Sequence, residues 1–445
     1  MNIGLYWFTQ DLRLDDNPAL LQAAKQCDRL ICVYVHDRQL ERPHTFNSTR
    51  LGSKRQRFLA QGLADLQQQL STLGQSLHRF AGDPLEVLST LVSQINIDQI
   101  FCTRPVGWYE ARQCDALSTR FPHLQWVMPD SYTLYADDQL QTVLADFPAS
   151  FSAFRRRMET LPVPVARPRV TCLPPPPNSH LPDSQPLPTP SPASRDEWFM
   201  GGELAAQSHL TRYFGDSLAS HYKEVRNALD GRDNGTRFSP WLAQGSLSPR
   251  RVYQQLSNYE AKQGANESTY WIFFELLWRE YFQWYARHHG SRLFHLHGIQ
   301  NRPPLTSFYP QRFKSWCEGS TPWPLVNACM KQLRATGYMS NRGRQIVASC
   351  LVNELQLDWR YGAAWFEQEL LDYDVASNWG NWQYMAGVGA DPRGKRRFDI
   401  NKQTQLYDPE GTFVKRWQGA AQQVAIDHVD AADWPIKPSL LDKRH

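Results

Sequence analysis

Short apolar runs alternate with helical patterns over the first 130 residues. Runs that are typical of buried strands lie at residues 3–8, 30–35, 77–80, 97–101 and 124–127. Apolar residues recur at helical spacing between them, over residues 17–27, 53–73, 84–94 and 109–121. This alternation predicts an N-terminal α/β domain over residues 1–135, with a doubly wound parallel sheet covered by helices on both faces. A small molecule bound there is expected beyond the carboxyl ends of the strands.

The pattern changes sharply after this domain. Twelve prolines fall between residues 161 and 192, so we predict extended chain there, within a Pro-rich interdomain linker over residues 136–198. Beyond it the pattern is helical and indicates a mostly α-helical second domain over residues 199–425, followed by a tail over 426–445. The expected helices span residues 203–214, 249–262, 268–287, 324–336, 340–354, 361–371 and 375–385.

Composition narrows the class of protein. Of 445 residues, 41% are hydrophobic and 21% charged, which is typical of a soluble globular protein. Without an apolar run of membrane-spanning length or a leader-like segment, we expect a cytoplasmic protein with no membrane association. Eight scattered cysteines without a CxxC pair argue against structural zinc, and no metal site is expected. A net charge of +4 is too mild to establish a nucleic-acid partner.

One predicted helix carries an unusual set of side chains. Glu275, Trp278 and Arg279 stand at i, i+3 and i+4 and therefore share a face. A carboxylate and a guanidinium on an otherwise apolar helix would be costly to bury without a ligand. The alternative is a rim of surface charge over a core tryptophan.

Two further segments carry polar groups on a helical face. Asn341, Arg344 and Gln345 share one face ahead of an apolar run that anchors the helix. In the segment 372–384, Asp374 is suited to cap a helix and Asn378 lies one turn further on. Capping explains one aspartate, whereas the whole run of polar and indole groups favours a polar, flat ligand.

Taken together, these motifs resemble the photolyase/cryptochrome family. The resemblance extends in order from residue 1 to about residue 420, and residues 340–345 and 378–384 resemble the DASH type. Other bacterial photolyases usually place Met at the position of Gln345 and Trp at that of Tyr384. The matching segments are WFTQDLRL at 7–14, GTRFSPWLA at 235–243, FELLWRE at 274–280, NRGRQ at 341–345 and NWGNWQY at 378–384.

The resemblance implies two cofactors. FAD would bind in a bent conformation within the helical domain, and 5,10-methenyltetrahydrofolate would serve as antenna, with Glu110 at its site. The residues that the resemblance assigns to FAD are Tyr222, Thr236, Arg237, Phe238, Ser239, Arg279, Arg344, Asp372, Asp374 and Asn378, with Arg344 paired to Asp372.

The function implied is that of a deoxyribodipyrimidine photo-lyase. Photoexcited reduced FAD would transfer an electron to a cyclobutane pyrimidine dimer flipped out of single-stranded or looped DNA. Glu275 would hydrogen-bond the base edge, and Trp278 and Tyr384 would stack on the bases, with Asn341 and Gln345 lining the cavity. Contacts with the DNA backbone are assigned to Arg226, Arg342 and Gln405.

A route for electrons to the flavin is also implied. Trp382 and Trp359 match its inner members, but the outer tryptophan is missing near residue 306. Tyr309 is a candidate replacement, with Trp316 and Trp323 as alternatives.

Other functions are left open by the sequence. The chain could be a blue-light photoreceptor that binds FAD and nucleic acid with little repair activity, or a flavoprotein that transfers electrons in the dark. The protein is expected to be a monomer. Paired histidines, which mark sites for the (6-4) lesion, are replaced here by Ser340 and Asn341.

Overall fold

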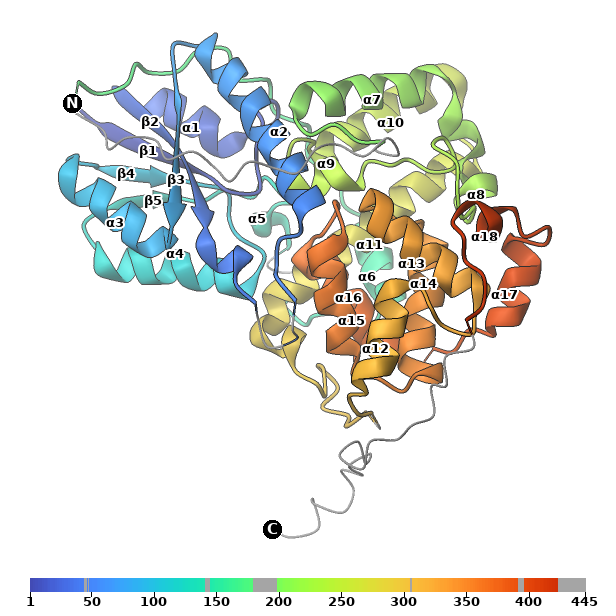
Figure 1. The fold of residues 1–445 in the computed structure, drawn as a ribbon. Helices are drawn as coiled ribbons and strands as arrows, with labels where there is room; N and C mark the ends of the chain where they lie inside the picture. Colours follow the sequence, from blue (N-terminus) through green and yellow to red (C-terminus); the bar gives the residue numbers. More distant parts are fainter. Residues whose placement is uncertain are drawn as a thin grey trace.

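The computed structural model describes residues 1–43, 46, 48–140, 145–178, 198–304, 306–390 and 396–422. An α/β part lies beside a larger helical part (Figure 1). This arrangement confirms the predicted fold class. The predicted tail at 426–445 and residues 179–197 of the predicted linker lie outside the described residues.

A five-stranded sheet forms the centre of the α/β part. All of its strands are parallel, in the order β3-β2-β1-β4-β5. Its strands are β1 (Ile3–Phe8), β2 (Arg29–Asp37), β3 (Leu77–Gly82), β4 (Gln99–Phe101) and β5 (Gln125–Val127). Its helices are α1 (Pro18–Gln26), α2 (Ser53–Ser71), α3 (Pro84–Gln94) and α4 (Trp108–Arg120). Each of these elements was predicted from the hydrophobic pattern.

Both faces of the sheet are covered. Tyr6 and Phe8 of β1 pack in one core with α1 and α2, whereas Leu5 and Trp7 point to a second core with α3 and α4. Strands that are buried on both faces consist of continuous apolar runs, and for this reason their positions could be predicted from the sequence.

The segment after the sheet contains two short helices, α5 (Asp137–Leu140) and α6 (Phe151–Met158). Phe151, Phe154 and Met158 are buried in the core of the helical part. Their spacing puts them on one side of α6, so this helix is anchored by its own apolar face. Residues 136–160 of the predicted linker thus contain two helices that were not located from the sequence, whereas residues 161–178, where extended chain was predicted, contain no helix or strand.

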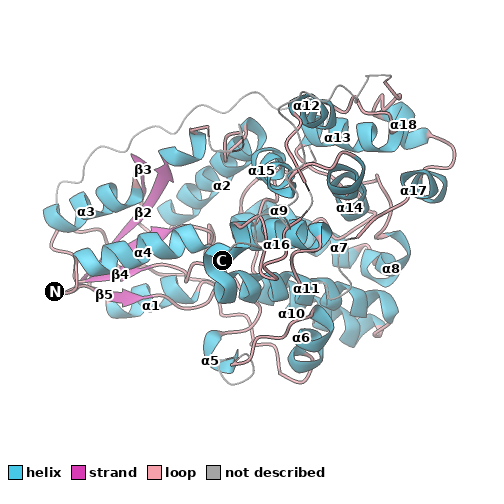
Figure 2. Ribbon diagram, turned by 90° about the horizontal axis from the view of Figure 1, so that it is seen from below, coloured by secondary structure: helices cyan, strands magenta, loops and turns pink. Residues whose placement is uncertain are grey.

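Helices make up the rest of the described chain, and the strands are confined to the N-terminal part (Figure 2). The seven helices predicted here are present, and five others among the described residues were missed: α8, α9, α12, α17 and α18. The helices are α7 (Glu203–Gly215), α8 (Tyr222–Val225), α9 (Ser239–Gln244), α10 (Pro249–Gln263), α11 (Glu267–His289), α12 (Pro310–Glu318), α13 (Pro324–Thr336), α14 (Asn341–Ser349), α15 (Trp359–Glu369), α16 (Val375–Ala386), α17 (Ile400–Tyr407) and α18 (Thr412–Arg416).

The described residues contain neither a membrane-spanning helix nor a cluster of metal ligands. No helix among them is both long and apolar enough to span a bilayer. No group of three or more His, Cys, Asp or Glu side chains in the same residues could hold a metal ion.

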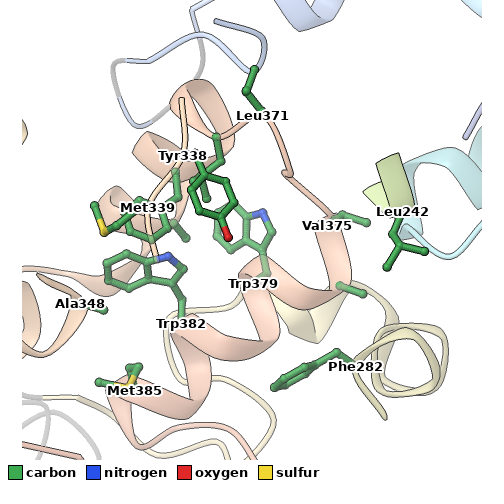
Figure 3. Packing of buried hydrophobic residues seen from close by; sticks show 14 of the residues in the cluster. Leu242, Phe282, Tyr338, Met339, Ala348, Leu371, Val375, Trp379, Trp382 and Met385 are labelled. Atoms are coloured by element: carbon green, nitrogen blue, oxygen red, sulfur yellow. The ribbon is translucent and has the colours of Figure 1, made fainter. Parts of the chain in front are cut away.

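Helix α16 lies at the centre of the helical part, packed closely against α11 and α15. Trp379 and Trp382 project from one side of it, and Phe282 approaches from another (Figure 3). A Cβ atom at Gly380 would come within 2.3 Å of the Phe282 ring, and one at Gly362 of α15 within 2.2 Å of Trp382. These glycines are required because the rings lie directly on the helix backbones.

The two parts are joined by buried polar contacts. Glu280 of α11 is 1% exposed and accepts hydrogen bonds from the backbone N–H groups of Leu134 (2.7 Å) and Tyr135 (3.0 Å). From the α/β part, the buried Arg13 donates to the carbonyls of Ser131 and Gly245. Buried polar groups satisfied in this way fix one docking arrangement, since breaking them leaves unpaired donors in the interior.

The end of α11 gives a pH-dependent prediction. The ring of His289 packs against Tyr285 with centroids 4.6 Å apart, and burial, with the nearby His288 and Arg292, lowers its pKa from 6.5 to about 4. Because the folded state then binds fewer protons than the unfolded state, stability falls as the pH drops from 6.5 through 4. We expect a loss of about 2 kcal/mol, allowing for partial exposure.

Urea unfolding at pH 7 and pH 4.5 measures this loss. His289→Phe is expected to remove that part of the pH dependence, whereas the same change at the exposed His123 should leave it intact. Identical pH profiles for the wild type and His289→Phe would contradict the assignment.

Candidate functional site

A cavity of about 750 Å³ opens between α6, α11, α14 and α16, and we call it the main cavity. A smaller hollow of about 150 Å³, the inner cavity, adjoins it against α15 and α16. Residues that line both are Asn341, Arg344, Gln345, Asp372, Ser377, Asn381, Tyr384 and Arg396. The two hollows therefore form one site with a shared wall.

Helix α11 supplies one side of the main cavity. Glu275 accepts a hydrogen bond from Arg226 (2.6 Å), and burial raises the pKa of Glu275 while the guanidinium opposes that rise. The Trp278 ring is stacked on Phe151, with centroids 3.7 Å apart and planes at 12°, and lies 6.0 Å from Tyr384. The predicted set of Glu275, Trp278 and Tyr384 thus meets in one cavity.

The opposite side comes from α14 and the segment before α16. Ser340 caps α14 by accepting from Gly343 N–H (3.1 Å), which places Asn341, Arg344 and Gln345 at the cavity wall. Arg344 donates to both oxygens of Asp372 (2.7 and 2.9 Å). The predicted pairing of Arg344 with Asp372 is therefore confirmed, and the hydroxyl of Ser239 also donates to Asp372 (2.6 Å).

Asp374 is held by three donors. It caps α16 by accepting from Ser377 N–H (2.6 Å), and it accepts from the Tyr132 hydroxyl (2.6 Å) and the Gln283 amide (2.9 Å). Arg279 lies 4.0 Å away and also donates to the carbonyl of Tyr132 (2.8 Å). The carboxylate at the inner cavity is thus fixed by residues from both parts of the molecule.

Asn378 lies one turn along α16 from Asp374. Its amide donates to the carbonyl of Ala363 (3.0 Å), and the residue lines the inner cavity.

Four residues assigned to the cofactor do not line either cavity: Tyr222, Thr236, Arg237 and Phe238. Tyr222 and Phe238 are buried in the core, and the Thr236 carbonyl lies 2.8 Å from His209 Nε2. Arg237 donates to the carbonyl of Gly231 (2.6 Å). Their contact with a cofactor stays a prediction.

The three residues assigned to the DNA backbone are spread apart. Arg226 lines the main cavity and is paired with Glu275, not directed to an outer surface. Arg342 donates to Asn227 (3.0 Å) beside the ring of Tyr407, and Gln405 is exposed on α17. Their contact with DNA stays a prediction.

Sequence reasoning missed the contribution of α6. Ser150, Phe151, Ser152 and Arg155 line the main cavity opposite α14, in a range that was predicted to be linker. The amphipathic pattern of residues 151–158 was the signal that could have located them.

Both indoles assigned to electron transfer are buried, and one of them, Trp382, lines the inner cavity. Trp382 lines that cavity and lies 6.2 Å from Trp316, while Trp359 lies 5.8 Å from Trp379. Tyr309 is 8% exposed beneath the guanidinium of Arg312. Trp316 is fully buried, so the contact between Trp382 and Trp316 leads into the interior of the protein and not to its surface.

The main and inner cavities fit a large, polar, flat cofactor such as FAD. Their volume is that of a cofactor site, and charged groups converge on the wall that they share. The buried hydroxyl of Tyr281, which lines the main cavity, has no hydrogen-bond partner among the described residues. A buried donor of this kind is normally satisfied, so a bound group is the expected partner.

A separate cavity of about 550 Å³, the antenna cavity, lies beyond the carboxyl ends of the strands. It is lined by residues that follow β1, β2 and β3 and by Tyr109 and Glu110 of α4, which is the predicted location for a ligand of this sheet. Burial raises the pKa of Glu110, and its Oε2 has no hydrogen-bond partner among the described residues. This site fits a ligand with hydrogen-bond donors, as a pterin ring has.

Comparisons with known proteins agree with this geometry. Residues 4–176 match the family model of DNA photolyase, and residues 271–440 match the model of the FAD binding domain of DNA photolyase. Cryptochrome DASH of Idiomarina loihiensis is 50% identical over 436 residues, covering 98% of this chain and 97% of that protein.

Solved structures give the same result. A Synechocystis cryptochrome matches with a TM-score of 0.90 at 37% identity, covering 94% of this chain and 88% of that chain. A class III photolyase from Agrobacterium tumefaciens matches with a TM-score of 0.81 at 28% identity, covering 94% of this chain and 86% of that chain.

These matches settle the cofactor class. The helical part carries an FAD-binding domain of the photolyase type, and the family binds a second, light-harvesting chromophore such as folate. The chain belongs to the photolyase/cryptochrome family, in its cryptochrome DASH group.

Proposed function

We propose that this protein repairs cyclobutane pyrimidine dimers under blue light, preferentially in single-stranded or looped DNA. The observation that carries the proposal is the meeting of Glu275, Trp278 and Tyr384 in a cavity continuous with the one lined by Asp372 and Asn378. A flipped base beside Glu275 and Trp278 would then adjoin a cofactor that extends from the inner cavity into the main cavity. Photolyases are among the enzymes that act on flipped bases.

Each side chain of the main cavity has a role that its geometry supports. Trp278 and Tyr384 offer ring surfaces to the two bases, and Glu275 offers a carboxyl group to their hydrogen-bonding edges. Arg226 positions that carboxyl through its 2.6 Å contact. Asn341 and Gln345 supply amides between the base and the Arg344–Asp372 pair.

The wall shared by the inner and main cavities supports cofactor binding. Bound there, FAD would supply the photochemistry and the single electron that opens the cyclobutane ring. Arg344, Asp372, Asp374 and Asn378 would hold its polar edges. Trp382, which lines the inner cavity, would pass electrons to it, with Trp359 as the next member of the route.

The preference for single strands follows from the stacking energy available. Each base stacked on an aromatic ring contributes about 1–3 kcal/mol, and that energy offsets the cost of unpairing. Gln345 stands beside Tyr384, so the cavity offers fewer and smaller apolar surfaces than one built from Met and Trp. A strand that is already unpaired does not carry that cost.

Illumination of the reduced holoprotein with dimer-containing oligonucleotides tests the proposal. Loss of the lesion is expected from single-stranded and looped DNA and much less from duplex, with no loss in the dark. Absence of repair from every substrate would overturn the proposal and favour a photoreceptor. Equal rates on single strand and duplex would overturn the substrate preference alone.

A further inference from the structure

The segment 371–374, between α15 and α16, forms a wall between the antenna cavity and the inner cavity. Leu371 and Tyr373 line the antenna cavity, whereas Asp372 and Asp374 line the inner cavity. Tyr373 lines both cavities. The segment begins with a turn in which the Tyr373 N–H donates to the Leu370 carbonyl (3.4 Å), and its side chains are shared between the two cavities.

Tyr373 is held by residues from both sides of the wall. Trp379 Nε1 of α16 donates to its hydroxyl (3.2 Å), and the guanidinium of Arg55 lies 4.6 Å from the centre of its ring. Arg55 itself lines the antenna cavity, whereas Trp379 belongs to the helix that Asp374 caps. A shift of the Tyr373 ring would therefore disturb Arg55 at the antenna cavity and Trp379 on α16.

The two neighbours of Tyr373 are the carboxylates assigned to the flavin. Asp372 is fixed by Arg344 and Ser239, and Asp374 by the cap of α16. Because one peptide unit separates each of them from Tyr373, the backbone cannot move at Tyr373 without moving both. The backbone of residues 372–374 therefore connects the antenna cavity with the inner cavity.

We propose that Tyr373 is a positioning residue that couples the two cavities. A flat chromophore in the antenna cavity holds the Tyr373 ring in place, keeps Asp372 and Asp374 positioned, and slows the release of FAD. The inference depends on the placement of FAD proposed above and does not depend on repair. By linkage, bound FAD must strengthen antenna binding by the same factor as the antenna strengthens FAD binding.

The rate of FAD release, followed by the rise in flavin fluorescence after dilution, tests the coupling. Wild-type protein saturated with 5,10-methenyltetrahydrofolate is expected to release FAD about fivefold more slowly than protein without folate. Tyr373→Leu is expected to bring this ratio to about one, and Tyr373→Phe, which loses only the hydroxyl bonded to Trp379, to about half of its wild-type value. A general loss of stability would change both rates and leave their ratio unaffected.

Tyr253→Phe is the matched control, because this tyrosine packs against Phe273 (ring centroids 5.1 Å apart) and lines none of the three cavities. It should keep the wild-type ratio. Equal release with and without folate in the wild type, or a full ratio in Tyr373→Leu, would overturn the proposal. Should the Leu variant not fold, an unchanged ratio in Tyr373→Phe would overturn it instead.

Asp372→Asn separates this inference from the placement of the cofactor. It should speed FAD release whether folate is bound or not, because the pairing with Arg344 is weakened. An unaltered rate would show that the placement of FAD is wrong, whereas a faster rate without coupling in the wild type would remove only the role of Tyr373.

Discussion

Replacing Asp374 with alanine is expected to lower the free energy of unfolding by about 3–5 kcal/mol, through loss of the cap and of two buried hydrogen bonds. The cap of α16 contributes about 1 kcal/mol. The Gln283 amide would lose its partner in the interior, at about 1–3 kcal/mol, whereas the Tyr132 hydroxyl can still donate to the Ala243 carbonyl (3.1 Å) and would lose about 1 kcal/mol. The variant is also expected to lose most of its FAD, because this carboxylate lines the inner cavity.

Asp374→Asn is the matched variant. Asparagine is an equally good cap, and its single oxygen can keep one of the two buried partners, so the expected loss is about 1 kcal/mol. Urea unfolding of the cofactor-free proteins measures both values without the stabilisation that bound ligand adds. Equal losses in the two variants, or a loss below about 1 kcal/mol for alanine, would contradict the role given to the three donors.

Asp374 also shows what the sequence could and could not reveal. Its capping role was predicted from the aspartate ahead of a helical pattern, since a cap is a local feature. Its partner Tyr132 lies 242 residues away along the chain and Gln283 lies 91 residues away. Neither pairing leaves a periodic signal, because the first exists only after the α/β and helical parts have docked, and the second only after α11 has packed against α16.

The same distinction between local pattern and long-range contact explains which helices and strands could be predicted. The strands and long helices were predicted closely because burial on two faces, or on one stripe, imposes a period on the sequence. Helix α6 was missed because eight residues beside a Pro-rich segment carry little periodic signal, although its Phe151 decides the shape of the main cavity. The lining of a cavity depends on which helices meet, and local pattern does not specify that.

Replacing Trp278 with alanine is expected to weaken the dark binding of a dimer-containing single strand about 10- to 100-fold. Stacking of a base on an aromatic ring contributes about 1–3 kcal/mol, and about 1.4 kcal/mol corresponds to tenfold in affinity. Binding of the same strand without the lesion should change by less than about twofold, because contacts with phosphates dominate it. Fluorescence anisotropy of labelled oligonucleotides measures both affinities, and FAD content reports whether the site stays intact.

The size of this effect depends on Phe151 as well as on Trp278. The two rings are stacked 3.7 Å apart, so Trp278 is already fixed and little side-chain freedom is lost when a base packs against it. Phe151→Ala should therefore weaken lesion binding in the same direction but less, whereas Trp323→Ala, at a tryptophan that lines neither cavity, should have no effect. An equal loss of affinity for damaged and undamaged strands in Trp278→Ala would mean that this ring supports general DNA binding, and that the flipped base lies elsewhere.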